Sequence, residues 1–199
     1  MAQPLRTFLR ALAGIALGLA LAASAGSLDV AQLMSALAKS QRSSATFTEK
    51  KYLAVLDKPV ESSGELLFVA PAHLEKRTLQ PRRETLLLDG DTLTLERSQR
   101  KRTLRLSSYP EIAAIIESIR ATLAGDADAL RRHYRVSLVG TSESWSLLLT
   151  PLDRKVVAVV SRIRIEGRED LVQTVEILQA DGDRSVMRID TGAPTAQTP

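Results

Sequence analysis

Beyond residue 40, the chain alternates apolar and polar residues over most of its length, and this period of two limits the fold more than any other feature. The clearest segment is Val60–Val69, where Leu66 and Phe68 share an uncharged face and Glu65 lies on the opposite one. The pattern predicts about eleven antiparallel strands, each apolar on one face only. Besides Val60–Val69, the predicted strands are Leu74–Gln80, Arg83–Asp89, Thr92–Ser98, Lys101–Leu106, Tyr134–Gly140, Trp145–Pro151, Val156–Glu166, Leu171–Ala180 and Arg184–Asp190.

Helical spacing replaces this alternation near the N-terminus. Apolar residues recur every three or four positions from Leu28, which predicts an amphipathic helix that ends near Ser40. Ser27 and Asp29 are both suitable caps for its first turn.

A second helical segment interrupts the strands in the middle of the chain. Pro110 suits its first turn and Gly125 its C-terminal stop, and a shorter helix is expected over Asp126–His133 with Asp126 as its cap. The apolar residues of this segment recur at i, i+3, i+4 and i+7, and are Ile112, Ile115, Ile116 and Ile119.

These elements predict an α+β protein that is mostly β. A single antiparallel sheet of about eleven strands must curl, and its apolar face needs a cover. The amphipathic helices are the only candidates for that cover. We therefore expect one curved, unclosed half-barrel with a helical lid, which encloses either a packed core or a cavity.

The N-terminus has the pattern of a signal peptide over residues 1–25. Arg6 and Arg10 precede an uncharged run, Ala11–Ala23, and Ala23-Ser24-Ala25 provides a small-x-small cleavage site. The run is shorter than the roughly 20 residues that a membrane-spanning helix needs, although an uncleaved anchor is the alternative. We expect export to the periplasm of a Gram-negative type of cell, a folded domain over residues 26–190 and a flexible tail over residues 191–199.

Composition excludes several classes of function. The expected leader holds two of the 27 Lys and Arg residues, which leaves 25 basic and 23 acidic residues and a net charge of +2, too little for nucleic-acid binding. Cys is absent, which removes thiol catalysis, and His73 and His133 lie on different predicted elements. We predict no enzymatic activity, cofactor or metal. Aromatic residues make up only 4%, so a pocket would be aliphatic and suited to alkyl chains.

Four segments, in order, resemble motifs of the LolA family of periplasmic lipoprotein carriers. Ala45–Glu49 is similar to the strand after the family's first helix, and Gly64–Pro71 resembles its Gly-x-Leu-x-x-x-x-Pro signature. Leu87–Leu93 resembles its Asp-Gly hairpin, and Leu147–Pro151 its Leu-x-Leu-x-Pro strand. The resemblance implies a half-barrel with a helical lid over an apolar cavity.

The resemblance also implies a function. Such a carrier holds the acyl chains of a lipoprotein and passes them from an inner-membrane donor to an outer-membrane acceptor, and we expect it to act as a monomer. Each candidate cargo contact has core packing as its alternative role. The candidates are Leu66, Phe68, Leu74, Leu86, Leu88, Leu93, Leu95, Ile112, Ile115, Ile116, Ile119, Trp145 and Leu147.

The sequence departs from the family pattern at several positions. Ala70 stands where well-studied carriers have an Arg that helps to latch the lid, and Lys76 stands where they have an aromatic residue. Leu93 and Leu95 occupy positions where members often have Trp or Tyr. These departures favour a divergent member with another amphiphile as cargo, such as a lipid or an aryl polyene. The alternative is a sensor or scaffold that binds a protein on the same sheet.

Overall fold

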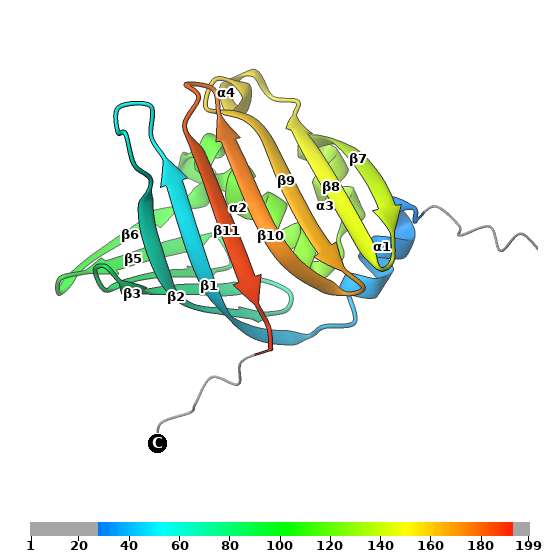
Figure 1. Cartoon of the computed structure of the whole chain (residues 1–199), viewed down its shortest axis with the longest axis horizontal. Helices are drawn as coiled ribbons and strands as arrows, with labels where there is room; N and C mark the ends of the chain where they lie inside the picture. The colour runs from blue at the N-terminus through cyan, green and yellow to red at the C-terminus, as the bar shows by residue number, and fades with distance from the viewer. Residues whose placement is uncertain (1–27, 193–199) are drawn as a thin grey trace, which may run out of the picture.

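Eleven antiparallel strands form one continuous sheet in the computed structural model, which describes residues 28–192 (Figure 1). The first half contains β1 (Arg42–Tyr52), β2 (Val60–Val69), β3 (His73–Gln80), β4 (Glu84–Asp89), β5 (Thr92–Arg97) and β6 (Arg100–Arg105). The second half contains β7 (Tyr134–Thr141), β8 (Ser144–Pro151), β9 (Val160–Arg168), β10 (Leu171–Gln179) and β11 (Arg184–Asp190). Within each half, successive strands are neighbours, and the pairing of β1 with β11 joins the halves.

The connection between the halves crosses the sheet. The edge strands β6 and β7 lie at opposite ends of the strand order, so the chain between them must span the whole width. It does so through η1 (Leu106–Ser108), α2 (Pro110–Ala124) and α3 (Ala127–His133). Figure 1 shows α2 and α3 behind the curved sheet, on its concave face. The predicted fold class, a mostly β half-barrel with a helical lid, is confirmed.

Side-chain caps determine where two of the helices begin. Asp29 accepts a hydrogen bond from the Gln32 amide at 2.7 Å, and the Gln32 side chain accepts one from the Asp29 amide at 3.1 Å. This capping box starts α1 (Val30–Leu37), which is shorter than the predicted helix. Asp126 caps α3 as expected, because its carboxylate accepts from the Ala129 amide at 2.8 Å.

The prediction of where one strand begins was wrong. Instead of a strand over Val156–Glu166, the chain first forms a helical turn, α4 (Arg154–Val157), because the Asp153 carboxylate accepts hydrogen bonds from two amides of that turn. The strand β9 therefore begins later, at Val160. Val160 is fully buried and the preceding Val159 is 38% exposed, while Ile163 and Ile165 further along the strand are buried.

Some predictions fall outside the residues that the structure describes. They are the signal peptide over residues 1–25, the alternative cap Ser27, and residues 193–199 of the expected tail. Within residues 28–192, no helix is long and apolar enough to cross a bilayer.

Buried apolar side chains form two separate clusters on the concave face. The larger one joins β7–β10 to α1, α2 and α3, and its members Leu147, Leu149 and Ile163 are fully buried. The smaller one joins β4 and β5 to the start of α2 around Leu88 and Leu93. Because α2 contributes to both clusters, the same helix packs against both halves of the sheet.

The helices α1 and α2 approach closely at Gly125. This residue ends α2 with a left-handed backbone (φ +69°), as its predicted role as a helix stop requires. A Cβ atom placed there would lie 2.2 Å from the Met34 carbonyl oxygen and 2.7 Å from the Ala38 Cβ. A side chain at this position would therefore push α1 away from α2.

Replacing Gly125 by Ala is expected to destabilise the fold by about 2–4 kcal/mol, because backbone strain adds to the collision with α1. Gly90→Ala is the matched control. Gly90 has a similar φ of +57°, but a Cβ atom added there would meet nothing within 4 Å, so strain alone should cost about 1–2 kcal/mol. Denaturant unfolding measures both losses, and equal losses would show that the contact between α1 and α2 contributes nothing.

Candidate functional site

A cavity of about 250 Å³ lies between the concave face of the sheet and the helix α2. Its walls come from both halves of the sheet, and Ile116, Ile119 and Leu123 of α2 form its cover. The lining extends along β1 from Ser43 to Glu49, six residues apart, which corresponds to about 20 Å of strand. Most of the lining is aliphatic. The space is therefore long, narrow and largely apolar.

Seven of the thirteen predicted cargo contacts line this cavity. They are Leu66, Phe68, Leu74, Leu86, Leu88, Ile116 and Ile119. They come from β2, β3, β4 and α2, elements that the fold brings together on the concave face. Whether these seven residues contact a cargo stays a prediction.

The other six predicted contacts lie outside the lining. Trp145 and Leu147 are buried in the larger cluster, where the Trp145 indole donates to the Glu169 carbonyl at 3.0 Å, and Ile115 packs against that cluster. In the smaller cluster, Leu93 is buried and Ile112 packs against it. Leu95 is half-buried on β5. The five residues of the two clusters pack against neighbouring side chains and do not line the cavity.

Sequence reasoning missed the side of the cavity formed by the second half of the sheet. These lining residues are Ile165, Val172, Val175, Ile177, Met187 and Ile189. Ile165, Met187 and Ile189 lie within the predicted strands Val156–Glu166 and Arg184–Asp190. The sequence pattern did not show that β11 pairs with β1, which brings this wall next to the first half.

A polar cluster interrupts the aliphatic lining, and its residues were not predicted. Glu49 is only 5% exposed, and its carboxylate lies 2.5 Å from the Lys76 ammonium. The Ser185 hydroxyl donates to Glu49 Oε1 at 2.6 Å, and the Ser62 hydroxyl donates to Oε2 at 3.4 Å. Period-two reasoning treats charged residues as solvent-facing, so only the tertiary structure places this pair inside.

The environment of Glu49 favours its charged form. Burial by itself raises the pKa of the Glu49 carboxyl. The positive charge of Lys76 and hydrogen bonds from Lys76 and Ser185 outweigh that effect, so the pKa lies below its ordinary value of 4.5. Glu49 therefore carries a negative charge at neutral pH and, with Lys76, forms an ion pair.

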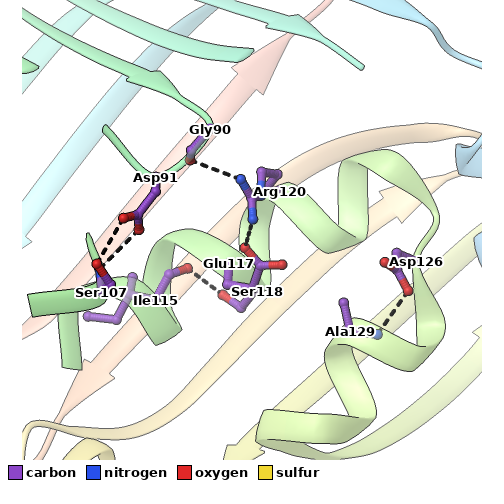
Figure 2. A network of polar contacts seen from close by, with 9 residues as sticks. All are labelled: Gly90, Asp91, Ser107, Ile115, Glu117, Ser118, Arg120, Asp126 and Ala129. Carbon is purple, nitrogen blue, oxygen red and sulfur yellow. Dashed lines mark hydrogen bonds and ion pairs between the residues drawn. The ribbon is translucent and has the colours of Figure 1, made fainter. Parts of the chain in front are cut away.

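The lid, η1 with α2, is attached to the turn between β4 and β5 (Figure 2). The Asp91 carboxylate accepts hydrogen bonds from the Ser107 amide at 3.0 Å and the Ser107 hydroxyl at 2.8 Å. Arg120 of α2 donates to the Gly90 carbonyl at 3.1 Å and pairs with Glu117 one turn earlier. These contacts place the start and the middle of the lid over the cavity.

Comparison with known proteins identifies the family. A family model described as outer membrane lipoprotein carrier protein LolA-like matches residues 22–198. This chain belongs to the LolA-like family. The predicted resemblance to the LolA family is confirmed. The prediction that the chain is not an enzyme agrees with this family of carriers, which bind without catalysing a reaction.

Individual relatives of this LolA-like chain are distant. The outer-membrane lipoprotein carrier protein of Pseudomonas entomophila strain L48 is 24% identical over 172 residues, which are 83% of this chain and 78% of the relative. A LolA superfamily protein from Nitrosomonas europaea is 11% identical with a TM-score of 0.42, over 83% of this chain and 93% of that one. MucB, in the Pseudomonas aeruginosa MucA/MucB complex, is 18% identical with a TM-score of 0.47. The match covers 85% of this chain and 59% of that one.

Two departures of this LolA-like chain from the family pattern have structural counterparts. At Ala70, the position of the expected latching Arg, the backbone amide donates to the Gln41 carbonyl at 2.9 Å. Another arginine, Arg120, ties the lid to the sheet from the lid side. At Lys76, the position of the expected aromatic residue, the side chain forms the ion pair with Glu49.

Replacing Glu49 by Gln is expected to remove stability in a pH-dependent way. The pKa of the Glu49 carboxyl is lower in the folded protein than in the unfolded chain, so its ionisation stabilises the fold above about pH 4.5. This contribution is lost as the pH falls through the folded pKa. At pH 7 the variant should therefore be less stable than the wild type by about 1–3 kcal/mol, and the gap should shrink below pH 4.5. Denaturant unfolding between pH 7 and pH 2.5 measures the gap.

The matched control for this prediction is Glu61→Gln. Glu61 also pairs with a lysine, Lys50, at 2.8 Å, but its side chain is 62% exposed, so the loss should be far smaller. A gap between Glu49→Gln and wild type that stays constant with pH would contradict the assigned pKa direction.

Replacing Arg120 by Ala is expected to loosen the lid. The loss of a charge-assisted hydrogen bond to Gly90 should make local opening of α2 about ten times more frequent, seen as faster amide hydrogen exchange in that helix. Arg131→Ala is the control, because Arg131 also pairs with an acid three residues away, Asp128, but on the surface of α3. Equal exchange in both variants would show that Arg120 does not restrain the lid.

Proposed function

We propose that this LolA-like chain is a periplasmic carrier. It binds the acyl chain of a lipoprotein or a related amphiphile beneath α2 and passes it towards the outer membrane. The observation that carries the proposal is the long, largely aliphatic cavity between the concave face and the lid. The family description, an outer membrane lipoprotein carrier, agrees with such a cargo.

The cargo contacts that we propose come from both halves of the sheet. From the predicted set they are the seven residues of β2, β3, β4 and α2 that line the cavity. To these the geometry adds Val175 and Ile177 of β10, Met187 and Ile189 of β11, and Leu123 of α2. An aliphatic wall contacts the methylene groups of any alkyl chain in the same way. It therefore suits a carrier of chains of varied length.

The size of the cavity limits what it accepts in this conformation. Its volume of about 250 Å³ exceeds the roughly 150 Å³ of an apolar cavity that binds benzene, and lies just below the roughly 300 Å³ of the smallest ligand pockets. We therefore expect one unbranched chain to be bound at a time. A cargo with several chains requires α2 to move away from the sheet.

The energetics suit binding followed by release. Each buried CH₂ group contributes about 0.8 kcal/mol, so a chain with twelve of them contributes about 10 kcal/mol before immobilisation costs of several kcal/mol. Release requires an open state of the lid only a few kcal/mol above the closed one. The hydrogen bonds of Arg120 and Asp91 to their partners are of that magnitude together.

The partners follow from the carrier hypothesis. We expect a donor at the inner membrane and an acceptor at the outer membrane, with the chain as a monomer between them. A protein-binding sensor or scaffold uses the same concave face for a different occupant. That alternative requires the cavity to stay free of lipid.

The experiment that tests the function is native mass spectrometry of the protein purified from its own cell envelope, with organic extraction of bound material. A defined mass increment that extracts as a lipid, lipopeptide or polyene supports the carrier. An apo mass, together with no binding of a fluorescent alkyl probe, contradicts the carrier and favours the scaffold.

Replacing Leu66 by Glu is expected to weaken binding of a fluorescent alkyl probe at least tenfold, because it places a charge against the chain. Leu95→Glu is the matched control, since Leu95 is also a half-buried leucine but lies outside the lining. Probe titration at neutral pH measures both, after circular dichroism has shown that the variants fold. Equal weakening in the two variants would contradict the assignment of the cavity as the binding site.

A further inference from the structure

An ion pair between the buried Glu49 and the Lys76 side chain, which is 21% exposed, lies among aliphatic side chains of the cavity. A hydrocarbon chain makes no use of such a pair. Glu49, Lys76 and Ser185 all line the cavity and come from β1, β3 and β11. The Lys76 ammonium lies 2.5 Å from the Glu49 carboxylate, and the Ser185 hydroxyl lies 2.6 Å from it. The three side chains therefore form one connected polar group inside the binding space.

Packing alone does not explain a charged pair at this position. Removing two charges from water carries a large desolvation penalty, and apolar residues of similar volume are often as stabilising as a buried ion pair. The neighbours of Lys76 on the adjacent strands, Leu66 and Leu86, show that leucine is accommodated at this level of the sheet. A polar group that lines a cavity for alkyl chains points instead to the polar part of the ligand.

The hydrogen-bonding groups that remain unused in this cluster are donors. The Glu49 carboxylate already accepts from Lys76, Ser62 and Ser185. An ammonium has three N–H donors, and within residues 28–192 the one hydrogen bond of the Lys76 side chain goes to Glu49. Its Nζ also lies over the ring of Phe47, 4.8 Å from the centre. Lys76 thus has donors available for an oxygen atom of a ligand.

Charge determines which kind of oxygen fits. The pair of Glu49 and Lys76 has no net charge, so a ligand carboxylate would add a second negative charge close to Glu49. The nearest further cation, Lys51, lies 3.7 Å from Glu49, but its side chain is 52% exposed and its charge is screened. An uncharged carbonyl oxygen accepts the same hydrogen bond without that repulsion.

We propose that Lys76 and Glu49 form a carbonyl-recognition site at which the ammonium of Lys76 donates to the ester or amide carbonyl of a bound acyl chain and Glu49 positions that ammonium. The proposal rests on the proposed carrier function and adds the polar determinant of its specificity. Leu66 and Leu86 flank Lys76 in the sheet and contact the first carbons of the chain. The remaining carbons lie along the aliphatic walls.

The test compares three ligands of matched chain length by displacement of a fluorescent alkyl probe from the full mature protein. Methyl dodecanoate has the carbonyl, dodecyl methyl ether lacks it, and dodecanoate carries a charge. The wild type should bind the ester about tenfold more tightly than the ether or the carboxylate. In the double variant Glu49→Gln with Lys76→Met, which leaves no unpaired buried charge, ester and ether should bind equally.

The control is the double variant Glu61→Gln with Lys50→Met, which removes the exposed ion pair at 2.8 Å between β1 and β2. It should keep the preference for the ester. If the wild type binds ester and ether equally, or prefers dodecanoate, the carbonyl site is overturned while the carrier stands. If none of the three ligands displaces the probe and the probe itself does not bind, the carrier function fails as well.

Discussion

The open edges of the sheet impose the main constraint on this molecule. The strands β6 and β7 end the sheet on opposite sides, and the chain between them has to cross the apolar concave face. Residues that cross such a face are buried, so they must satisfy their own backbone hydrogen bonds, which a helix does. The helices α2 and α3 therefore connect the halves and cover the face with the same residues. The two buried clusters, the cavity and the lid all follow from this crossing.

The cavity exists because one helix, α2, covers two halves of the sheet that are packed to different extents. On one side α1, α2 and α3 pack against β7–β10, and on the other only the start of α2 packs against β4 and β5. Between these contacts, Ile116, Ile119 and Leu123 of α2 face the cavity. The hydrogen bonds of Asp91 and Arg120 attach the lid to the turn between β4 and β5, in addition to its packing in both clusters.

Most elements were predictable because their determinants are local. The caps Asp29 and Asp126, the stop at Gly125 and the alternation of the strands depend on residues a few positions apart. The exception is α4, where a run of valines suits a strand and a helical turn equally, and the Asp153 cap decided in favour of the turn. That turn moved Val160 instead of Val159 onto the core face.

The sequence by itself determined the type and order of the elements and the apolar face of each strand, since side chains alternate along any strand. It did not distinguish Leu66, which lines the cavity, from Leu147 in a filled cluster, because both belong to the same kind of face. Only the tertiary structure decided which apolar residues meet space and which meet each other. It alone also placed Glu49 beside Lys76, since that contact joins residues 27 positions apart in the chain, on β1 and β3, which are separated by β2 in the sheet.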